Sequence, residues 1–133
     1  MRPRSSLLAL AVAAALAVAT AGCAPLATTV EIVLKHSRFT PAAIEVPAGV
    51  PVTFVIRNAD PIDHEWIIGD GDIHQRHRTG TEPVHDEKPT EVTVPALETR
   101  TTTITFDRAG VFAVVCHLPR HEAYGMVGSL RVR

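Results

Sequence analysis

Apolar residues from Val30 onward recur mostly at every second position, in short runs that Pro, Gly and Asp interrupt. A period of two is the pattern of half-buried β-strands, whereas a helix repeats its apolar positions every three or four residues. The runs with this pattern span residues 30–35, 44–46, 52–57, 64–68, 91–94, 101–106, 111–116 and 127–132. Short antiparallel strands must bury one face against a second sheet, so the pattern predicts an all-β sandwich or barrel of about seven or eight strands.

One long stretch, residues 69–88, lacks this alternation and is strongly polar. We expect it to form a loop, and a loop of this length in a small domain is usually functional or mobile. It contains His74, His77 and His85, which are candidate ligands of an accessory metal ion. The alternative, which we favour at this point, is that they belong to a solvated loop without a metal.

The first 22 residues differ from the rest and predict an export signal. Arg2 and Arg4 precede an uncharged apolar stretch at 7–19, which is shorter than the roughly 20 residues that span a bilayer. Small residues then lead into Cys23, as they do at bacterial lipoprotein processing sites. We therefore expect a lipid on Cys23, a short tether at 23–29 and a single domain at 30–133. The alternative is ordinary cleavage after Ala21.

The expected location is thus the periplasm or the outer face of the cell membrane, with membrane association through that lipid. The charges argue against nucleic acid as a partner, because the 13 basic and 14 acidic residues are scattered along the chain. Such a distribution gives no basic patch for nucleic acid. The length leaves little room for a second domain, and we expect a monomer.

The segment between the last two predicted strands contains candidate metal ligands. Cys116, His121 and Met126 follow one another with four residues in each gap. Thiolate, imidazole and thioether together suit copper, whereas a structural zinc site is usually made of four Cys or His ligands in short paired spacings. His64, at the start of its own strand, can supply the second imidazole. A disulfide between Cys116 and Cys23 is the alternative in an exported protein, and it is lost if Cys23 carries a lipid.

Segments 58–65 and 116–126 resemble the two ligand segments of the cupredoxins, the small blue copper proteins, and the resemblance extends over residues 30–133. It implies a Greek-key β-sandwich that holds one type 1 copper ion through His64, Cys116, His121 and an axial Met126. It also implies one-electron transfer between transient redox protein partners, without catalytic residues. The four-and-four ligand spacing is similar to that of the rusticyanin and sulfocyanin type.

The same resemblance implies that His121 lies near the surface and acts as the electron port. The apolar patch around it would consist of Leu118, Pro119, Ala123 and Tyr124. The alternative function is that of a copper carrier or copper-resistance protein. It is suggested by the further histidines His36, His74, His77 and His85. A metal-free adhesive sandwich would require the four-residue match to be accidental.

His117 needs a separate interpretation, because multicopper oxidases and copper nitrite reductases resemble the segment 116–121. Those proteins build further copper centres with a His on both sides of the Cys or with several domains, whereas here Val115 precedes Cys116. Strand alternation points His117 away from Cys116, toward the opposite face of the sheet. We expect it to be structural or exposed at the surface.

Overall fold

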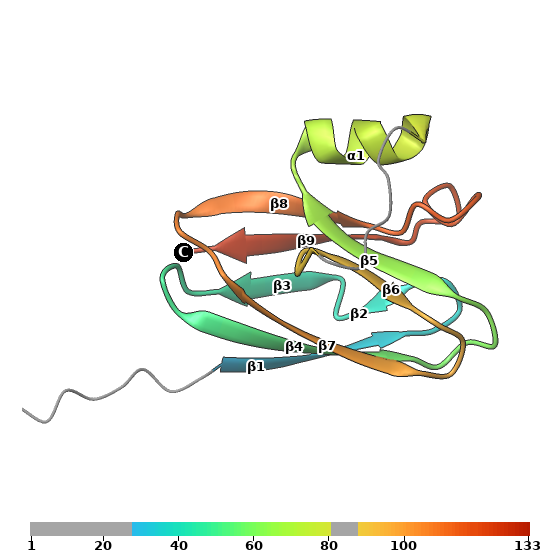
Figure 1. Cartoon of the computed structure of the whole chain (residues 1–133), viewed down its shortest axis with the longest axis horizontal. Coiled ribbons are helices and arrows are strands. Elements are labelled where there is room, and N and C mark those ends of the chain that lie inside the picture. The colour runs from blue at the N-terminus through green and yellow to red at the C-terminus, as the bar shows by residue number, and fades with distance from the viewer. Residues whose placement is uncertain (1–27, 81–87) are drawn as a thin grey trace, which may run out of the picture.

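The computed structural model describes residues 28–80 and 88–133, which form two stacked β-sheets and one helix (Figure 1). The strands are β1 (Thr28–Leu34), β2 (Phe39–Thr40), β3 (Ala43–Val46), β4 (Pro51–Asn58), β5 (His64–Gly69), β6 (Glu91–Val94), β7 (Thr99–Thr105), β8 (Gly110–Val115) and β9 (Val127–Val132). The helix is α1 (Gly71–Thr79). The all-β sandwich expected from the alternating pattern is confirmed, and the eight predicted strands correspond to all of these strands except the two-residue β2.

One sheet has the strand order β2-β1-β4-β7, and the other has the order β3-β9-β8-β5-β6. Two neighbouring pairs, β1 with β4 and β3 with β9, run parallel, and the remaining pairs run antiparallel. The alternating pattern suggested antiparallel strands throughout, so these two parallel pairs are a difference from expectation. A strand's own alternation reports which face is buried, but its neighbour and their relative direction depend on the connections.

The core lies between the sheets and follows the predicted alternation closely. Val52, Phe54 and Ile56 on β4 have no exposed surface, while the residues between them are partly or fully exposed. Trp66 on β5 faces this strand from the other sheet, with its ring centroid 4.8 Å from that of Phe54. The packing of these large side chains fixes the spacing of the two sheets.

The expected loop at 69–88 is wrong for its first half, because residues 71–79 form α1. The Asp70 side chain accepts hydrogen bonds from the backbone N–H groups of Asp72 and Ile73, at 3.1 and 3.0 Å, and so caps the start of the helix. Gly80 ends it with a left-handed conformation, φ 70°. The sequence pattern did not reveal this helix because it carries no apolar stripe. Its end caps and the residues packed against it stabilise it instead. His85 lies outside the described residues.

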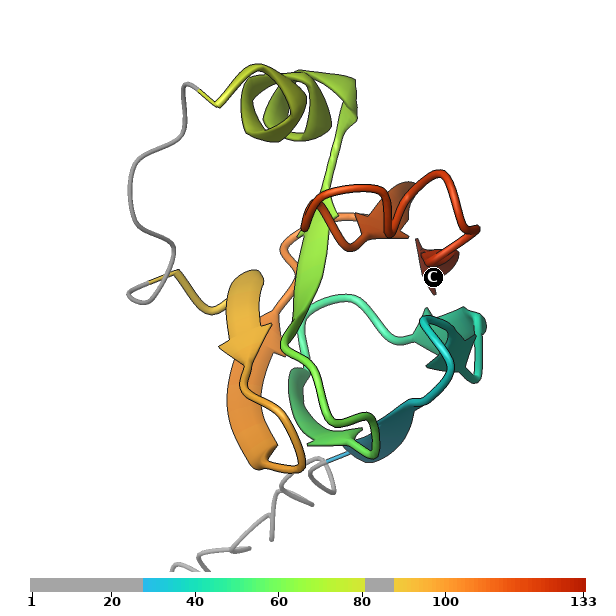
Figure 2. The same cartoon turned by 90° about the vertical axis from the view of Figure 1, so that its right-hand side faces the viewer.

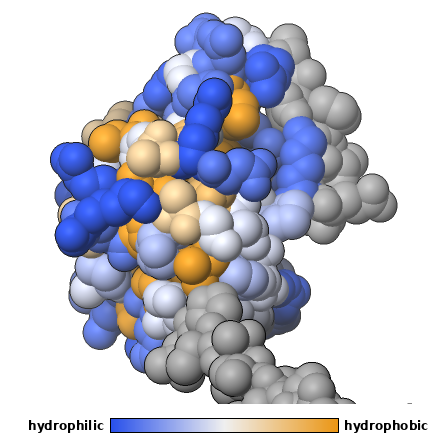
Figure 3. Space-filling view, turned by 90° about the vertical axis from the view of Figure 1, so that its left-hand side faces the viewer, coloured by the Kyte–Doolittle hydropathy of each residue, from blue (hydrophilic) through white to orange (hydrophobic). Residues whose placement is uncertain are grey.

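The two ends of the sandwich differ in the strand ends and loops that lie there. β1 begins and β9 ends at one end, which has apolar patches scattered among strongly polar side chains (Figure 3). The β8–β9 loop and the start of β5 lie together at the opposite end (Figure 1). Helix α1 lies outside the five-stranded sheet, on the side away from the other sheet (Figure 2). The predicted signal sequence and Cys23 lie outside the described residues.

Within residues 28–80 and 88–133, the structure contains no helix with the length and apolar character needed to cross a membrane.

Candidate metal centre

The predicted ligands come from two separate parts of the chain that meet at one end of the sandwich. His64 is the first residue of β5, Cys116 directly follows β8, and Met126 directly precedes β9. His121 lies in the turn that joins these two strands. β5 pairs with β8, and β8 pairs with β9, so strand pairing brings the four positions to the same end of the sheet.

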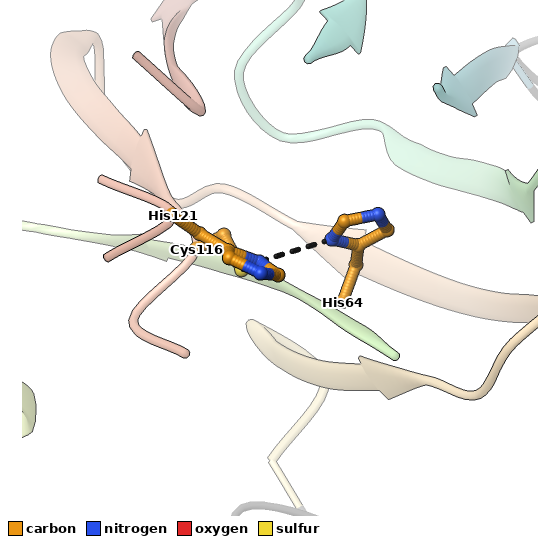
Figure 4. A group of neighbouring side chains, drawn as sticks. All are labelled: His64, Cys116 and His121. Atoms are coloured by element: carbon orange, nitrogen blue, oxygen red, sulfur yellow. Dashed lines mark hydrogen bonds between the residues drawn. The ribbon is translucent and has the colours of Figure 1, made fainter. Parts of the chain in front are cut away.

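Three of these side chains turn their donor atoms toward one another (Figure 4). Nδ1 of His64 lies 3.2 Å from Nδ1 of His121, and Sγ of Cys116 lies 3.3 Å from the same His121 nitrogen. The three donor atoms all lie within 4.8 Å of one another. Metal bonds of about 2.0 Å to nitrogen and 2.3 Å to sulfur would span the 3.2 and 3.3 Å separations at angles of roughly 100°. One ion can therefore contact all three donors.

Asp60 decides which nitrogen of His64 faces the other donors. Its Oδ2 lies 2.8 Å from Nε2 of His64, within the buried interior. A carboxylate can only accept, so Nε2 carries the proton and donates it, and Nδ1 is left with its lone pair toward His121. Asp60 is not among the site residues predicted from the sequence, although its position four residues before His64 is a signal of this role.

The Asp60 carboxylate is itself held by the backbone. It accepts hydrogen bonds from the N–H groups of His36 and Ser37, at 2.8 and 3.0 Å. Burial raises the pKa of Asp60, but these two donors and the neighbouring His64 more than offset it and lower the pKa to about 2. The carboxylate is thus ionised at neutral pH and keeps the His64 ring in one orientation.

Asn58 supports the loop that carries Asp60. Its amide Nδ2 donates to the backbone oxygens of Ile62, Val94 and Pro95, at 2.7 to 3.1 Å, and its Oδ1 accepts from the N–H of Asp60. The side chain is 2% exposed, so these bonds form away from competing water. The loop between β4 and β5 is therefore tied to the end of β6.

Cys116 is fully buried and receives a hydrogen bond on its sulfur. The backbone N–H of Glu65 donates to Sγ at 3.3 Å. Burial raises the pKa of the Cys116 thiol to about 11. Because the thiolate is the metal ligand, binding must release this proton, and metal affinity depends on pH accordingly.

Met126 is also fully buried and belongs to the same apolar cluster as Cys116. Its backbone fixes the loop, since its N–H donates to the oxygen of His121 and its oxygen accepts from the N–H of Cys116, at 3.0 and 3.2 Å. These bonds place Met126 beside the three converging donors. Its role as an axial ligand remains a prediction.

The turn around His121 is held from outside by Arg38. The Arg38 guanidinium donates to the backbone oxygen of Tyr124 and lies against Gly125, where an added Cβ would approach it to 3.3 Å. Gly125 has φ 89°, a left-handed conformation that glycine adopts without strain. His121 is half-buried, and burial and the neighbouring His64 lower its pKa.

The residues expected to surround His121 do reach the surface. Tyr124 is 52% exposed, Pro119 and Ala123 are exposed, and Leu118 is partly buried against the core. This end of the sandwich therefore presents apolar side chains next to His121, the more exposed of the two predicted imidazole ligands.

His117 points away from Cys116, as strand alternation predicts. Its side chain is only 4% exposed, so of the two expectations for it, exposure at the surface is wrong and packing in the structure is right. It contacts the imidazoles of His74 and His77 on α1, with ring centroids 5.2 Å away in each case. His36, by contrast, is exposed.

The donor chemistry tests which metal fits the first cluster. Two neutral imidazole nitrogens and a thiolate, with a thioether in the same buried layer, combine the soft sulfur that favours Cu(I) with nitrogen that Cu(II) accepts. Among the described residues, no other group of three or more His, Cys, Asp and Glu side chains has its donor atoms within the same 4.8 Å. The cluster matches copper better than a structural zinc site.

Comparison with known proteins agrees with this chemistry. The family model described as "Cupredoxin-like domain" matches residues 6–127. The copper-resistant cuproprotein CopI of Rubrivivax gelatinosus is 34% identical over 109 residues, which cover 79% of this chain and 66% of that protein. CopI of Pseudomonas aeruginosa is 42% identical over 50 residues, 38% of this chain and 28% of that protein. The chain thus spans just under two thirds of the first relative and less of the second.

Solved structures show the same fold at lower identity. Dithionite-reduced auracyanin from Roseiflexus castenholzii has a TM-score of 0.68 and 21% identity, over 80% of this chain and 98% of that one. Auracyanin A, a "blue" copper protein from Chloroflexus aurantiacus, has a TM-score of 0.63 and 24% identity over the same shares. At this identity the likeness concerns the fold alone. The match over residues 6–127 and the His64, Cys116 and His121 cluster together place this chain in the cupredoxin-like family, whose fold here carries a donor set that fits copper.

Proposed function

We propose that this chain is an exported mononuclear copper protein that carries single electrons between redox protein partners. The observation that carries the proposal is the convergence of His64, Cys116 and His121 in a buried cluster whose surroundings hold each donor in place. When bound there, copper supplies the one-electron Cu(I)/Cu(II) couple.

The residues around the cluster limit how far the donors move when the charge changes. Asp60 fixes the ring of His64, the N–H of Glu65 fixes the sulfur of Cys116, and the backbone of Met126 fixes the turn that carries His121. Rigid donors reorganise little when an electron arrives or leaves, which keeps transfer fast. Outer-shell hydrogen bonds also tune the potential of the site.

The surface near His121 supports a transient docking role. Its imidazole is the ligand nearest solvent, and Pro119, Ala123 and Tyr124 give it an exposed apolar rim. Redox partners typically dock through small interfaces of this kind and dissociate quickly.

Copper tolerance is a second candidate function, and one observation favours it. The relatives with 34% and 42% identity are named copper-resistant cuproproteins. A protein in that role would hold or deliver copper. The same predicted ligands would bind it, namely His64, Cys116, His121 and Met126. The two candidates differ in whether the bound copper stays in place through repeated oxidation and reduction.

Voltammetry of the copper-loaded protein tests the electron-transfer proposal. We expect an intense visible absorption band and a reversible one-electron wave, with no loss of copper to a Cu(I) chelator between cycles. A colourless protein, or one that gives up its copper to the chelator on each reduction, would favour carriage of copper and contradict electron transfer.

Cys116→Ser identifies the site in the same assay. The hydroxyl keeps the side chain small but removes the thiolate, so the visible band should vanish. Val111→Ser, on the strand β8 that precedes Cys116, is the matched control, because Val111 is 63% exposed at the far end of that strand. If Cys116→Ser retains the band, the ligand assignment is wrong.

Export and a lipid on Cys23 belong to this proposal too. The charged start, the apolar stretch at 7–19 and the small residues before Cys23 support them. Mass spectrometry of the mature protein tests both: a diacylglyceryl mass on Cys23 is expected, and an unmodified start at Gly22 would contradict lipidation.

A further inference from the structure

A second cluster of imidazoles lies on the outer face of the five-stranded sheet, beneath α1. His74 and His77 come from the helix, and His117 is the second residue after β8. His74 is 2% exposed, and the side chains of His77 and His117 are 2% and 4% exposed. Three neighbouring histidines this deeply buried are unusual, because histidine is ordinarily intermediate in burial.

Two of these rings turn nitrogens toward each other. Nδ1 of His74 lies 2.9 Å from Nε2 of His117. Nε2 of His74 lies 3.2 Å from the backbone oxygen of Ala113, which can only accept, so this nitrogen carries the proton. Nδ1 of His74 therefore presents its lone pair to His117.

The other nitrogen of His117 faces a carboxylate. Its Nδ1 lies 3.7 Å from Oε2 of Glu122, and Glu122 is held by a bidentate contact with Arg78 on α1. The 3.7 Å separation is longer than a hydrogen bond, but when His117 carries its proton on Nδ1, the Nε2 lone pair faces His74. The backbone oxygen behind His74 and the carboxylate behind His117 are the outer-shell partners that metal-binding histidines have.

His77 lies one helical turn further along α1. Its Nδ1 lies 2.8 Å from the backbone oxygen of Ile73, so this nitrogen donates. Oε2 of Glu91 lies 3.6 Å from Nε2 of His77. The ring of His77 stacks on that of His117 with an interplanar angle of 20°. A third imidazole thus packs against the ring of His117.

We propose that His74 and His117 form a second metal site, which binds a divalent first-row transition ion separately from the Cys116 site. Two bonds of about 2.0 Å that meet at roughly 90° span the observed 2.9 Å. His77 stacks on His117, but its nitrogens do not complete a three-donor group within 4.8 Å in the described residues. Imidazole and carboxylate donors without sulfur suit Cu(II), Zn(II) and Ni(II), and Cu(II) binds such donors most tightly in this series.

Both sites can be filled at once, because their ligands leave the chain on opposite faces. Cys116 points into the core with His64 and His121, and His117 points outward to α1. This inference goes beyond the proposed electron transfer and holds whether or not that proposal is right. The alternative is that the histidines only hydrogen-bond to one another and hold α1 in place.

Metal titration of the protein with its first site already filled by copper tests the proposal. We expect calorimetry to find one further equivalent of Zn(II). Added Cu(II) should give a second paramagnetic resonance signal, of nitrogen-ligated copper without a thiolate, beside that of the first site. Absence of a second equivalent would overturn the proposal.

Variants locate the second equivalent. His117→Asn and His74→Gln remove one facing nitrogen each, and each should abolish it, whereas Gln75→Ala, an exposed residue of α1, should retain it. The visible band of the first site reports in each variant that the sandwich is intact. If both histidine variants retain the equivalent with that band present, the metal binds elsewhere and the assignment is wrong.

Because a variant at a buried histidine can fail to fold, the wild-type protein supplies an independent readout. Crystals soaked in Zn(II) should show an anomalous peak between Nδ1 of His74 and Nε2 of His117. A peak only at surface residues, or none, would contradict the proposal without reference to any variant.

Discussion

The Asp60 carboxylate and the His64 imidazole form a buried pair, in which Nε2 donates to Oδ2 at 2.8 Å. The pair fixes the tautomer of a ring that we predict to bind the metal and places a full negative charge behind it. Since Asp60 also accepts from the backbone near the start of β2, the orientation of His64 depends on a segment more than 20 residues away.

The first prediction concerns this pair. In Asp60→Asn, one carboxylate oxygen becomes an amide N–H₂ that cannot accept, so a bond to His64, His36 or Ser37 is lost. We expect copper affinity to fall by about 10- to 100-fold, as it does when outer-shell partners of metal ligands are removed. Competition with a chelator of known affinity measures the change.

Loss of the negative charge should also raise the reduction potential, because the charge favours Cu(II) over Cu(I). Asp63→Asn is the matched control. Asp63 lies in the same loop but is exposed and accepts only from the N–H of Ala96 among the described contacts. Equal effects in the two variants would mean that Asp60 has no special role.

The second prediction tests Met126 as the axial ligand. Met126→Leu keeps the buried volume but removes the thioether, which leaves a more apolar position beside the copper. Copper should still bind and absorb visible light, and its reduction potential should rise, because the weak sulfur donor no longer supports Cu(II). Voltammetry measures the shift.

Leu130→Met, on β9 and also fully buried, controls for a change of side chain in the same core. A potential that moves equally in both variants, or in neither, would show that Met126 is not a ligand.

The third prediction concerns the close approach of β9 to the segment before β3. A Cβ added at Gly128 would lie 2.6 Å from the backbone oxygen of Ala42, which also accepts from the N–H of Ser129. Gly128→Ala must push these segments apart, and we expect it to lower the free energy of unfolding by about 1 to 3 kcal/mol. Urea denaturation of the metal-free protein measures this.

Gly71→Ala is the comparison. Gly71 opens α1, and an added Cβ there meets no atom within 4 Å. Alanine favours the helix by roughly 0.5 to 1 kcal/mol, so this variant should be neutral or slightly more stable. Destabilisation of the same size at both positions would argue against the contact with Ala42.

The fourth prediction concerns Asn58, whose amide makes four hydrogen bonds in the interior. Asn58→Ala leaves buried carbonyl groups and the N–H of Asp60 without their partner. Each such loss costs about 1 kcal/mol or more, so we expect a total loss of roughly 2 to 4 kcal/mol in the free energy of unfolding. Chemical denaturation checks this, and a loss below about 0.5 kcal/mol, typical of a surface substitution, would contradict it.

The positions of most strands follow from the sequence, and the reason is local. Alternation along β3 and β4 depends only on which side chains face the core, and the predicted starts and ends of the strands differ from the observed ones by at most two residues. The chemistry of the ligand segment is equally local, since Cys116, His121 and Met126 lie within one turn between two strands.

Other features escaped the sequence because they depend on distant partners. Helix α1 has no apolar stripe. Its position depends on the cap formed by Asp70 and on the contact between His74 and His117, which lies after β8. The direction of β1 beside β4 and of β3 beside β9 is likewise decided by the paths of the connections.

The sequence by itself determined the strand pattern, the copper-type donors and the order in which they occur, because spacing and side-chain chemistry are properties of short segments. Only the tertiary structure decided that Asp60 orients His64, and that His117 joins His74 and His77 under α1. Those relationships join residues from 4 to 43 positions apart along the chain, and side chains so placed meet only when the sheets and the helix have packed.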